Sequence, residues 1–499
     1  MKKLSLLIFL TGFLYSVSFA SFDFNTNCKT AYEKIINLRF DEGKKLIENE
    51  KTTHPSNLIP LYLDNYIDFL KIFISEDISL FNKLKSNKDI RINKIEDEEN
   101  ESPYYNYCIA EINLQWAFAR LKFKEYITAA SEINSAYKLL EKNEKAYPKF
   151  IPNRKGLGLL HSMIGTIPDD YKWVSKLIGM NGSVNQGINE LSSLLLTATI
   201  DPEYEYLKTE CIFYLSFIEL NAQSNKEGAL KLSKYLEKPE YSELIQNNPL
   251  LCYACSNIAL KTFANDKAIK ILLARPTDKE YYPFHYLDYQ TGIAKLNRLD
   301  SDAYKYFYSF ILNFKGQNYI KSAYQKLAWY YLINNNTAKY KEKMNNVLTL
   351  GSTLVDEDGQ ALTEAKSNTI PNIILLKARL LCDGGYFQKA LNILSEKKPS
   401  EFCVSPKDFL EYSYRLGRIY HEWGLSAKAI PFYELTIKNG SSSIYYFAAN
   451  SALHLGYIYE NNGNKEKAKY YYELCSSMKN TEYKNSINQK AKAGLNRLQ

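Results

Sequence analysis

The side chains best suited to acid–base or metal chemistry are five histidines, and they are scattered along the chain. Only His421 and His454 are expected to approach each other, because they lie on the first helices of neighbouring predicted helical hairpins. Neither has a histidine, aspartate or glutamate four residues further on, which a chelating pair on one helix would need. We therefore predict no metal site here and interpret His421 as a residue of a binding groove or of the surface.

The eight cysteines are even in number, which would permit disulfides in an oxidising compartment. Cys252 and Cys255 are one helical turn apart in the apolar run LLCYACSNIAL. A redox Cys-X-X-Cys motif normally opens a helix after a strand, and no strand pattern precedes this pair. Buried thiols are therefore favoured over redox activity.

Motifs of several catalytic classes are absent from the sequence, namely the G-x-S-x-G turn, the phosphate-binding loop, the H-E-x-x-H motif and a paired Cys-X-X-Cys zinc spacing. The 499-residue chain has a net charge of +8, and its 53 lysines outnumber its 10 arginines. A surface that reads phosphates normally clusters its cations and favours the bidentate guanidinium, so nucleic acid is not expected as a partner. The sequence predicts a protein that is not an enzyme and has no cofactor.

The stretch GTIPDDYKWVSKLIGMNGSVNQG, residues 165–187, interrupts long helical runs, and six of the 21 glycines fall between residues 156 and 187. Its aromatic residues Tyr171 and Trp173, with Trp116, could line a pocket of an envelope enzyme or of a protein that handles glycans or lipids. No acid–base pair or nucleophile accompanies them. We favour a joint in which the glycines end helices and permit close crossings, with Tyr171 and Trp173 as a secondary binding surface.

The elements that would position these side chains follow from an internal repeat near the C-terminal end. The segments LKARLLCDGGYFQKAL, RLGRIYHEWGLSAKAI and HLGYIYENNGNKEKAK align without gaps at a period of 39 residues. Small residues recur in one register, for example Ala378, Gly417 and Gly456. The pattern predicts helical hairpins, in which Gly424 ends a first helix in a left-handed conformation and Ala429 fits where the second helix crosses it.

At these positions the sequence resembles the tetratricopeptide repeat family, in particular exported proteins of the Bacteroidota type. The family pattern corresponds to Leu416, Gly417, Tyr420, Gly424, Ala429 and Tyr433, and again to Leu455, Gly456, Tyr459, Gly463, Ala468 and Tyr472. The chain departs from the family in its longer period, in Ser413 or Ala452 at the tryptophan position, and in the missing closing proline. The resemblance implies an all-α fold, a right-handed α-solenoid of helical hairpins with a less regular helical N-terminal half.

In this family the first helices of the hairpins line a concave groove that holds a peptide or a partner helix. Carried over by position, the inward-facing residues are Arg379, Asp383, Glu411, Tyr414, Arg418, His421, Glu422, Asn450, Tyr457 and Glu460. The lysine–asparagine clamp of some members is not reproduced, since Leu375, Leu453 and Tyr414 occupy its positions. The alternative interpretation is that these are ordinary solvated helix residues. The resemblance implies a scaffold or adaptor whose partner is a protein or peptide.

Residues 1–20 have a basic start at Lys2 and Lys3, an apolar run and a small-residue end, which predict a signal peptide cut before Ser21. The apolar run is shorter than the roughly 20 residues of a membrane span, and no later run reaches that length. We therefore expect export to the periplasm, rather than secretion to the extracellular space, and no integral membrane segment after cleavage. Beyond the signal peptide we expect an N-terminal helical region (21–150), the joint (151–200), degenerate hairpins (201–350) and a C-terminal array with a capping helix (351–499).

Overall fold

The computed structural model describes residues 21–98, 101–166, 179–221, 226–480 and 482–498. Over these ranges the chain forms helices and no strand, which confirms the predicted all-α class. The described residues group into two compact units: the first holds 21–73, 78–211 and 279–282, and the second holds 74–77, 212–278 and 283–498. The predicted signal peptide and both members of the predicted secondary surface, Tyr171 and Trp173, lie outside the described residues.

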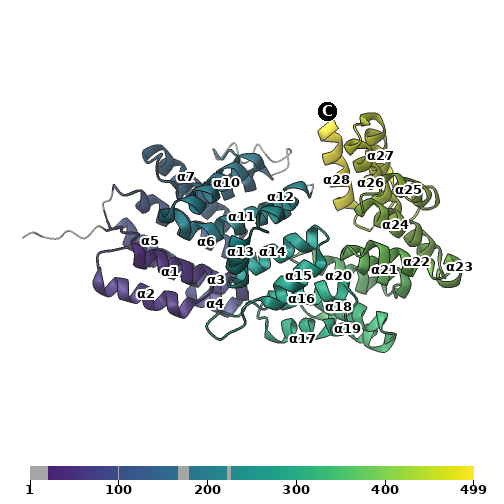
Figure 1. Cartoon of the computed structure of the whole chain (residues 1–499), viewed down its shortest axis with the longest axis horizontal. Coiled ribbons are helices and arrows are strands. Elements are labelled where there is room, and N and C mark those ends of the chain that lie inside the picture. Colours follow the sequence, from purple (N-terminus) through teal and green to yellow (C-terminus); the bar gives the residue numbers. More distant parts are fainter. Residues whose placement is uncertain (1–20, 99–100, 167–178, 222–225, 481, 499) are drawn as a thin grey trace, which may run out of the picture. The chain divides into compact units, whose positions relative to one another are not determined.

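The first unit is built largely from consecutive helices that pair with each other (Figure 1). Its elements are α1 (Thr26–Ile36), α2 (Phe40–Thr53), α3 (Ile59–Ser75), α4 (Ile78–Leu84), α5 (Asn87–Glu96), α6 (Pro103–Lys122), α7 (Tyr126–Ala146), α8 (Asn153–Gly165), α10 (Val184–Ile200) and the short 3-10 helix η2 (Pro202–Leu207). Helix α1 packs on α2, α6 on α7 and α8 on α10. Helix α6 is central to this unit, because residues on all its faces are buried.

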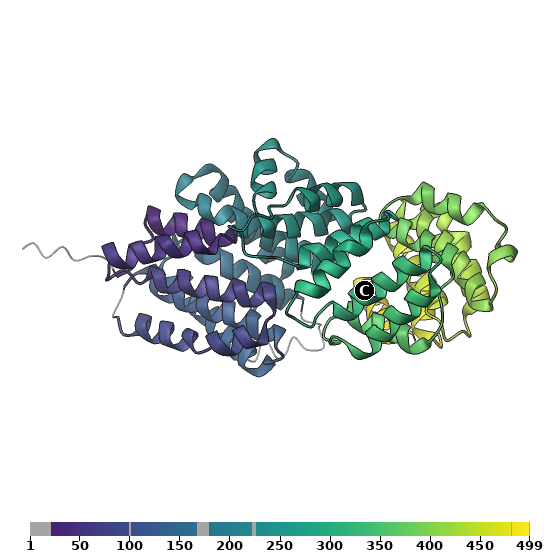
Figure 2. The same ribbon diagram turned by 90° about the horizontal axis from the view of Figure 1, so that it is seen from below.

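The second unit continues the same construction. Its elements are α11 (Lys208–Asn221), which begins in the first unit, α12 (Glu227–Tyr235), α13 (Pro239–Gln246), α14 (Pro249–Lys261), α15 (Asn265–Ala274), α16 (Tyr286–Asn297), α17 (Ala303–Asn313), α18 (Ile320–Ile333), α19 (Thr337–Thr349), α20 (Asp356–Ser367), α21 (Ile373–Asp383), α22 (Phe387–Ser395), α23 (Pro399–Phe402), α24 (Pro406–Glu422), α25 (Ser426–Gly440), α26 (Phe447–Asn461), α27 (Lys465–Ser477) and α28 (Lys484–Leu498). The C-terminal helices α24 to α28 lie side by side in both views (Figure 1, Figure 2). Apolar side chains here form several local clusters between neighbouring helices.

Eight hairpin turns of the described chain share one backbone feature. In each, the first helix is followed by a residue with positive φ: Leu38, Lys124, Phe263, Leu299, Asn335, Gly385, Gly424 and Gly463. Seven positions before each of these residues stands a small residue, in the same order Ala31, Ala117, Ser256, Gly292, Ala328, Ala378, Gly417 and Gly456. The register that the C-terminal repeat predicts therefore recurs in hairpins of both units.

The small residues are required by close helix contact. A Cβ atom at Gly417 would lie 2.7 Å from Cδ1 of Tyr433, and one at Gly456 would lie 2.3 Å from Cε1 of Tyr472. Both tyrosines are fully buried on the second helix of the same hairpin. The turn residue Gly424 has φ +81°, so the predicted close crossing and the predicted left-handed helix end are both confirmed.

The described part of the predicted joint is a tight helix crossing. A Cβ atom at Gly182 would lie 2.6 Å from Cα of His161, and one at Gly187 would lie 2.1 Å from the carbonyl oxygen of Gly158. Helices α8 and α10 thus contact each other backbone to backbone, which only glycine permits. The side chain of Ser183 caps the N-terminus of α10.

The eight cysteines are all buried and unpaired, which confirms the interpretation of Cys252 and Cys255 as buried thiols. None of the described helices is both long and apolar enough to cross a membrane.

Candidate functional site

The shared hairpin register places one set of side chains on successive first helices. One position after the small residue stand Trp329 on α18, Arg379 on α21, Arg418 on α24 and Tyr457 on α26. These helices pack in succession, α18 on α21, α21 on α24 and α24 on α26. We call these four residues, together with the polar side chains beside them, the first-helix row.

Ion pairs link α21 to α24 within the first-helix row. Nη2 of Arg418 lies 2.8 Å from Oδ1 of Asp383, and Nε of Arg379 lies 3.8 Å from Oδ2 of the same carboxylate. The three side chains are 22 to 31% exposed. Burial alone would lower the pKa of Arg418, but Asp383 together with other nearby acidic groups outweighs burial and raises that pKa. Three predicted groove residues, Arg379, Asp383 and Arg418, are thus brought together in a half-buried network of ion pairs.

The end of α24 carries a second ion pair. Nζ of Lys226 lies 2.7 Å from Oε2 of Glu422 and 3.6 Å from the ring centre of Phe263. Burial would raise the pKa of Glu422, but Lys226 and Arg418 together lower it to about 2. Glu422 therefore keeps its charge at neutral pH and is held in one orientation.

The two histidines approach each other as the sequence predicts. The ring centres of His421 and His454 are 5.2 Å apart in an edge-to-face arrangement, and His454 stacks on Tyr433 with 5.3 Å between ring centres. Burial, followed by the effect of the neighbouring His421, lowers the pKa of His454 to about 3. Both rings are therefore neutral at pH 7, since burial lowers the pKa of His421 as well. Within the described chain, no three histidine, cysteine or acidic side chains gather as a metal site.

Two predicted groove residues on α24 expose little of their side chains to solvent. Tyr414 is 2% exposed, and its hydroxyl oxygen accepts a hydrogen bond of 2.6 Å from Nδ2 of Asn450. Glu411 pairs with the buried Arg415 of its own helix, at 2.6 Å from Nη2. These side chains position their neighbours more than they present themselves to a ligand.

The C-terminal helix α28 contributes to the last part of the first-helix row. Arg497 donates two hydrogen bonds to the carboxylate of Glu460, at 2.7 and 2.8 Å. The ring of Tyr457 is half-buried between Tyr472, at 5.8 Å between ring centres, and His454, at 6.2 Å. Arg497 of the predicted capping helix therefore lowers the pKa of Glu460 and stabilises its carboxylate in the charged form.

Sequence reasoning missed the α18 end of the first-helix row. Nε1 of Trp329 donates to Oε1 of Glu364 at 2.8 Å, while Nζ of Lys326 lies 3.6 Å and Cζ of Arg379 lies 4.6 Å from the ring centre of Trp329. The sequence offered a signal, because Ala328 matches the small position of the repeat. Trp329 follows it as Arg379 follows the small residue of α21.

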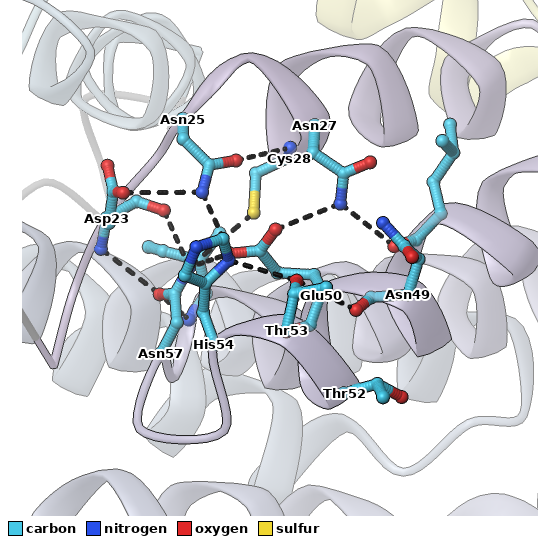
Figure 3. A network of polar contacts seen from close by, with 12 residues as sticks. Asp23, Asn25, Asn27, Cys28, Asn49, Glu50, Thr52, Thr53, His54 and Asn57 are labelled. Carbon is cyan, nitrogen blue, oxygen red and sulfur yellow. Dashed lines mark hydrogen bonds and ion pairs between the residues drawn. The ribbon is translucent and has the colours of Figure 1, made fainter. Parts of the chain in front are cut away.

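A buried acidic side chain in the first unit is surrounded by three amide donors and by His54, whose Nδ1 lies 3.1 Å from its Oε1 (Figure 3). Glu50 is 1% exposed and accepts hydrogen bonds from the side-chain amides of Asn25 at 2.8 Å, Asn27 at 3.0 Å and Asn57 at 2.8 Å. Burial opposes its charge, but these donors outweigh burial and lower the pKa of Glu50. Asn57 also pairs with the backbone of Asp23 through both its oxygen and its nitrogen. The network has a structural role, because it holds the N-terminal segment of the chain against the end of helix α2.

A second buried charge cluster surrounds Lys155, whose side chain is 0% exposed. Its Nζ lies 2.7 Å from Oε2 of Glu111 and 3.0 Å from Oε2 of Glu210, and it donates to the hydroxyls of Tyr32 and Tyr62 at 3.3 Å. Burial raises the pKa of Glu111 against the opposing effect of Lys155. Because every member is buried, this cluster is structural as well.

A surface hollow of about 400 Å³ borders the predicted joint. Its lining is mostly on α7, includes Tyr137 and Gly179, and contains one carboxylate, Glu141. The pair of carboxylates that acid–base catalysis would use is not present in this lining.

The chain has no match among protein-family models and none among curated protein sequences.

Proposed function

We propose that this protein is an exported scaffold or adaptor without enzymatic activity, which binds a protein or peptide along the first-helix row. In this proposal the hairpins form a right-handed solenoid of tetratricopeptide type and the first-helix row lines its concave face. The recurrence of one hairpin register in eight turns of the described chain supports the repeat architecture.

The observation that carries the proposal is the pairing of charges between successive first helices. Arg418 and Asp383 join the first helices α24 and α21, and Lys226 joins the end of α24 to the N-terminus of α12. These side chains are half-buried yet keep part of their surface open. A polar face whose side chains are already ordered loses little conformational entropy on binding, which favours a recognition role over that of ordinary solvated residues.

A capture experiment tests this proposal. The mature chain, residues 21–499, is immobilised and exposed to an envelope extract, as wild type and as the variant Arg379→Ala, Arg418→Ala, Tyr457→Ala. Tyr414 is left unchanged because it is buried. A matched control changes Lys428, Lys438 and Tyr470, which lie on the second helices α25 and α27.

We expect a specific partner to be captured by wild type and by the control but not by the triple variant. Circular dichroism shows whether each variant keeps its helix content. Equal recovery by wild type and a folded triple variant would remove the first-helix row as the binding surface.

Periplasmic localisation and cleavage before Ser21 are part of the proposal. Phe22 and Phe24 are each 7% exposed, and Phe24 stacks on Tyr206 with 5.0 Å between ring centres, so the chain is anchored immediately after the proposed cut. Fractionation and intact mass measurement should find the protein in the periplasm, beginning at Ser21. Recovery from the cytoplasm with Met1 retained would refute export.

A further inference from the structure

The α18 end of the first-helix row combines two cations with one indole ring. Lys326 and Arg379 approach the same ring, that of Trp329, from two different helices. The ring is buried, at 2% exposure, whereas both cationic side chains are half-buried. A bound group would therefore meet the ammonium and guanidinium groups and not the ring.

The nearby carboxylates are already occupied. Glu364 accepts hydrogen bonds from Nε1 of Trp329 at 2.8 Å and from Nε2 of Gln325 at 2.6 Å. Asp383 lies closer to Arg418, at 2.8 Å, than to Arg379, at 3.8 Å. Neither acid is a close ion-pair partner of Lys326 or of Arg379.

Lys326 itself has only a neutral acceptor. Its Nζ donates to Oε1 of Gln325 at 2.9 Å, and it forms no ion pair with a carboxylate in the described part of the chain. Lys326 and Arg379 therefore lie side by side without a close carboxylate partner of their own, whereas Arg418 is paired with Asp383. Two such half-buried cations favour an anion that can accept hydrogen bonds from both an ammonium and a guanidinium group.

We propose that Lys326 and Arg379 bind an aspartate or glutamate side chain of a partner's peptide segment at this end of the first-helix row. This inference rests on the proposed function and names the chemistry of the partner. An acidic peptide is the occupant because the site forms part of an extended row, where neighbouring residues of a peptide would also find polar contacts.

The titration of Lys326 supports this assignment. Burial, assisted by the neighbouring Arg379, lowers the pKa of Lys326 to about 7 against the opposing effect of the acids Glu364, Asp383 and Glu357. A bound carboxylate would reverse this balance and raise the pKa. Peptide binding should thus be coupled to proton uptake by Lys326 near neutral pH.

Fluorescence anisotropy with a labelled hexapeptide of alternating aspartate and glutamate provides the test, with the asparagine–glutamine isostere as second probe. The variants are Lys326→Met and Arg379→Met, and the control is Lys341→Met, an exposed lysine on the second helix α19. We expect the acidic peptide to bind wild type and control alike, and each site variant about tenfold more weakly, as for a lost charge-assisted hydrogen bond. Arg379→Met keeps the test valid if Lys326→Met does not fold.

The pH profile separates this site from general charge attraction. Affinity of wild type should rise as the pH falls from 8 to 6, because more Lys326 is protonated, and the rise should be absent from Lys326→Met. Equal binding of the two peptides would overturn the proposal. So would equal affinity of Lys326→Met and Lys341→Met, or full displacement of the peptide by equimolar inorganic phosphate.

Failure of this inference is distinguishable from failure of the proposed function. If Lys326→Met still captures the envelope partner and the triple variant does not, the first-helix row binds a partner through other contacts. If wild type and the folded triple variant capture equally, the proposed function itself fails.

Discussion

Buried charges in the first unit show how single residues are stabilised away from water. Lys155 has two carboxylates and two tyrosine hydroxyls around its ammonium group. Glu50 has three amide donors around its carboxylate. Each arrangement replaces lost hydration with fixed partners, so removal of one partner leaves an uncompensated group in the interior.

Substitution of Lys155 should therefore destabilise the protein strongly. Lys155→Met removes the ammonium group that lies between the buried carboxylates of Glu111 and Glu210, and we expect a loss of about 3–5 kcal/mol in the free energy of unfolding. Urea unfolding followed by circular dichroism measures the loss. The control Lys145→Met changes a lysine whose side chain is 80% exposed and should shift stability by less than about 0.5 kcal/mol. A loss below about 1 kcal/mol for Lys155→Met would contradict the structural role.

Glu50 should contribute stability that depends on pH. Its pKa is lowered from 4.5 in the folded chain, so its contribution is fully present above pH 4.5 and is lost as the pH falls through the folded value. Glu50→Gln should cost about 1–3 kcal/mol at pH 7, and the difference from wild type should shrink below pH 4.5. Urea midpoints at pH 7 and at pH 3.5 check this. The control Glu48→Gln, on the same helix with 55% exposure, should change stability by less than about 1 kcal/mol.

At the scale of helices, close crossing sets which glycines can be replaced. Gly456→Ala brings a Cβ atom to 2.3 Å from a ring atom of Tyr472, so we expect a loss of about 1–3 kcal/mol from overpacking. Gly359 lies inside α20, and a Cβ atom there would meet nothing within 4 Å. Gly359→Ala should instead stabilise the protein by about 0.5–1 kcal/mol through helix propensity. Thermal unfolding of the two variants compares them, and a loss for Gly359→Ala as large as that for Gly456→Ala would refute the crossing argument.

Some hairpin turns are predictable from their sequence and others are not. Gly385, Gly424 and Gly463 mark three turns with the residue that left-handed backbone prefers, and these hairpins were predicted. Other turns place Phe263 or Leu299 at positive φ, which no propensity rule anticipates. Tertiary packing imposes that conformation, so the sequence predicted degenerate hairpins over residues 201–350 but did not identify these turn residues.

The candidate site was predictable to a similar extent. The approach of His421 and His454 follows from the repeat, because they lie on the successive first helices α24 and α26 and the small residues fix which faces meet. The grouping of Lys326 and Arg379 around Trp329 joins α18 to α21 across the intervening α19 and α20. This contact depends on how the chain folds back over the extra helix α20, which lies outside the repeat pattern, so the pattern carries no information about it.

At the scale of the whole molecule, the cysteines make folding depend on the redox conditions of the compartment. All eight are buried and unpaired, and burial raises the pKa of Cys252 to about 12 and that of Cys403 to about 11. Thiolate, the reactive form, is therefore scarce in the folded chain even in an oxidising environment.

We expect a thiol reagent such as Ellman's to modify almost none of these cysteines in the native protein and all eight after denaturation. Fewer than eight reactive thiols in the denatured, unreduced protein would reveal disulfides and contradict this structure. The same reasoning predicts a folding constraint for an exported protein, since the unfolded chain exposes every thiol to oxidation before packing can protect it. Refolding from denaturant should therefore recover the native circular dichroism spectrum in the presence of reductant. Refolding under oxidising conditions should recover less of it, and a variant with all eight cysteines changed to alanine or serine should lose this dependence on reductant.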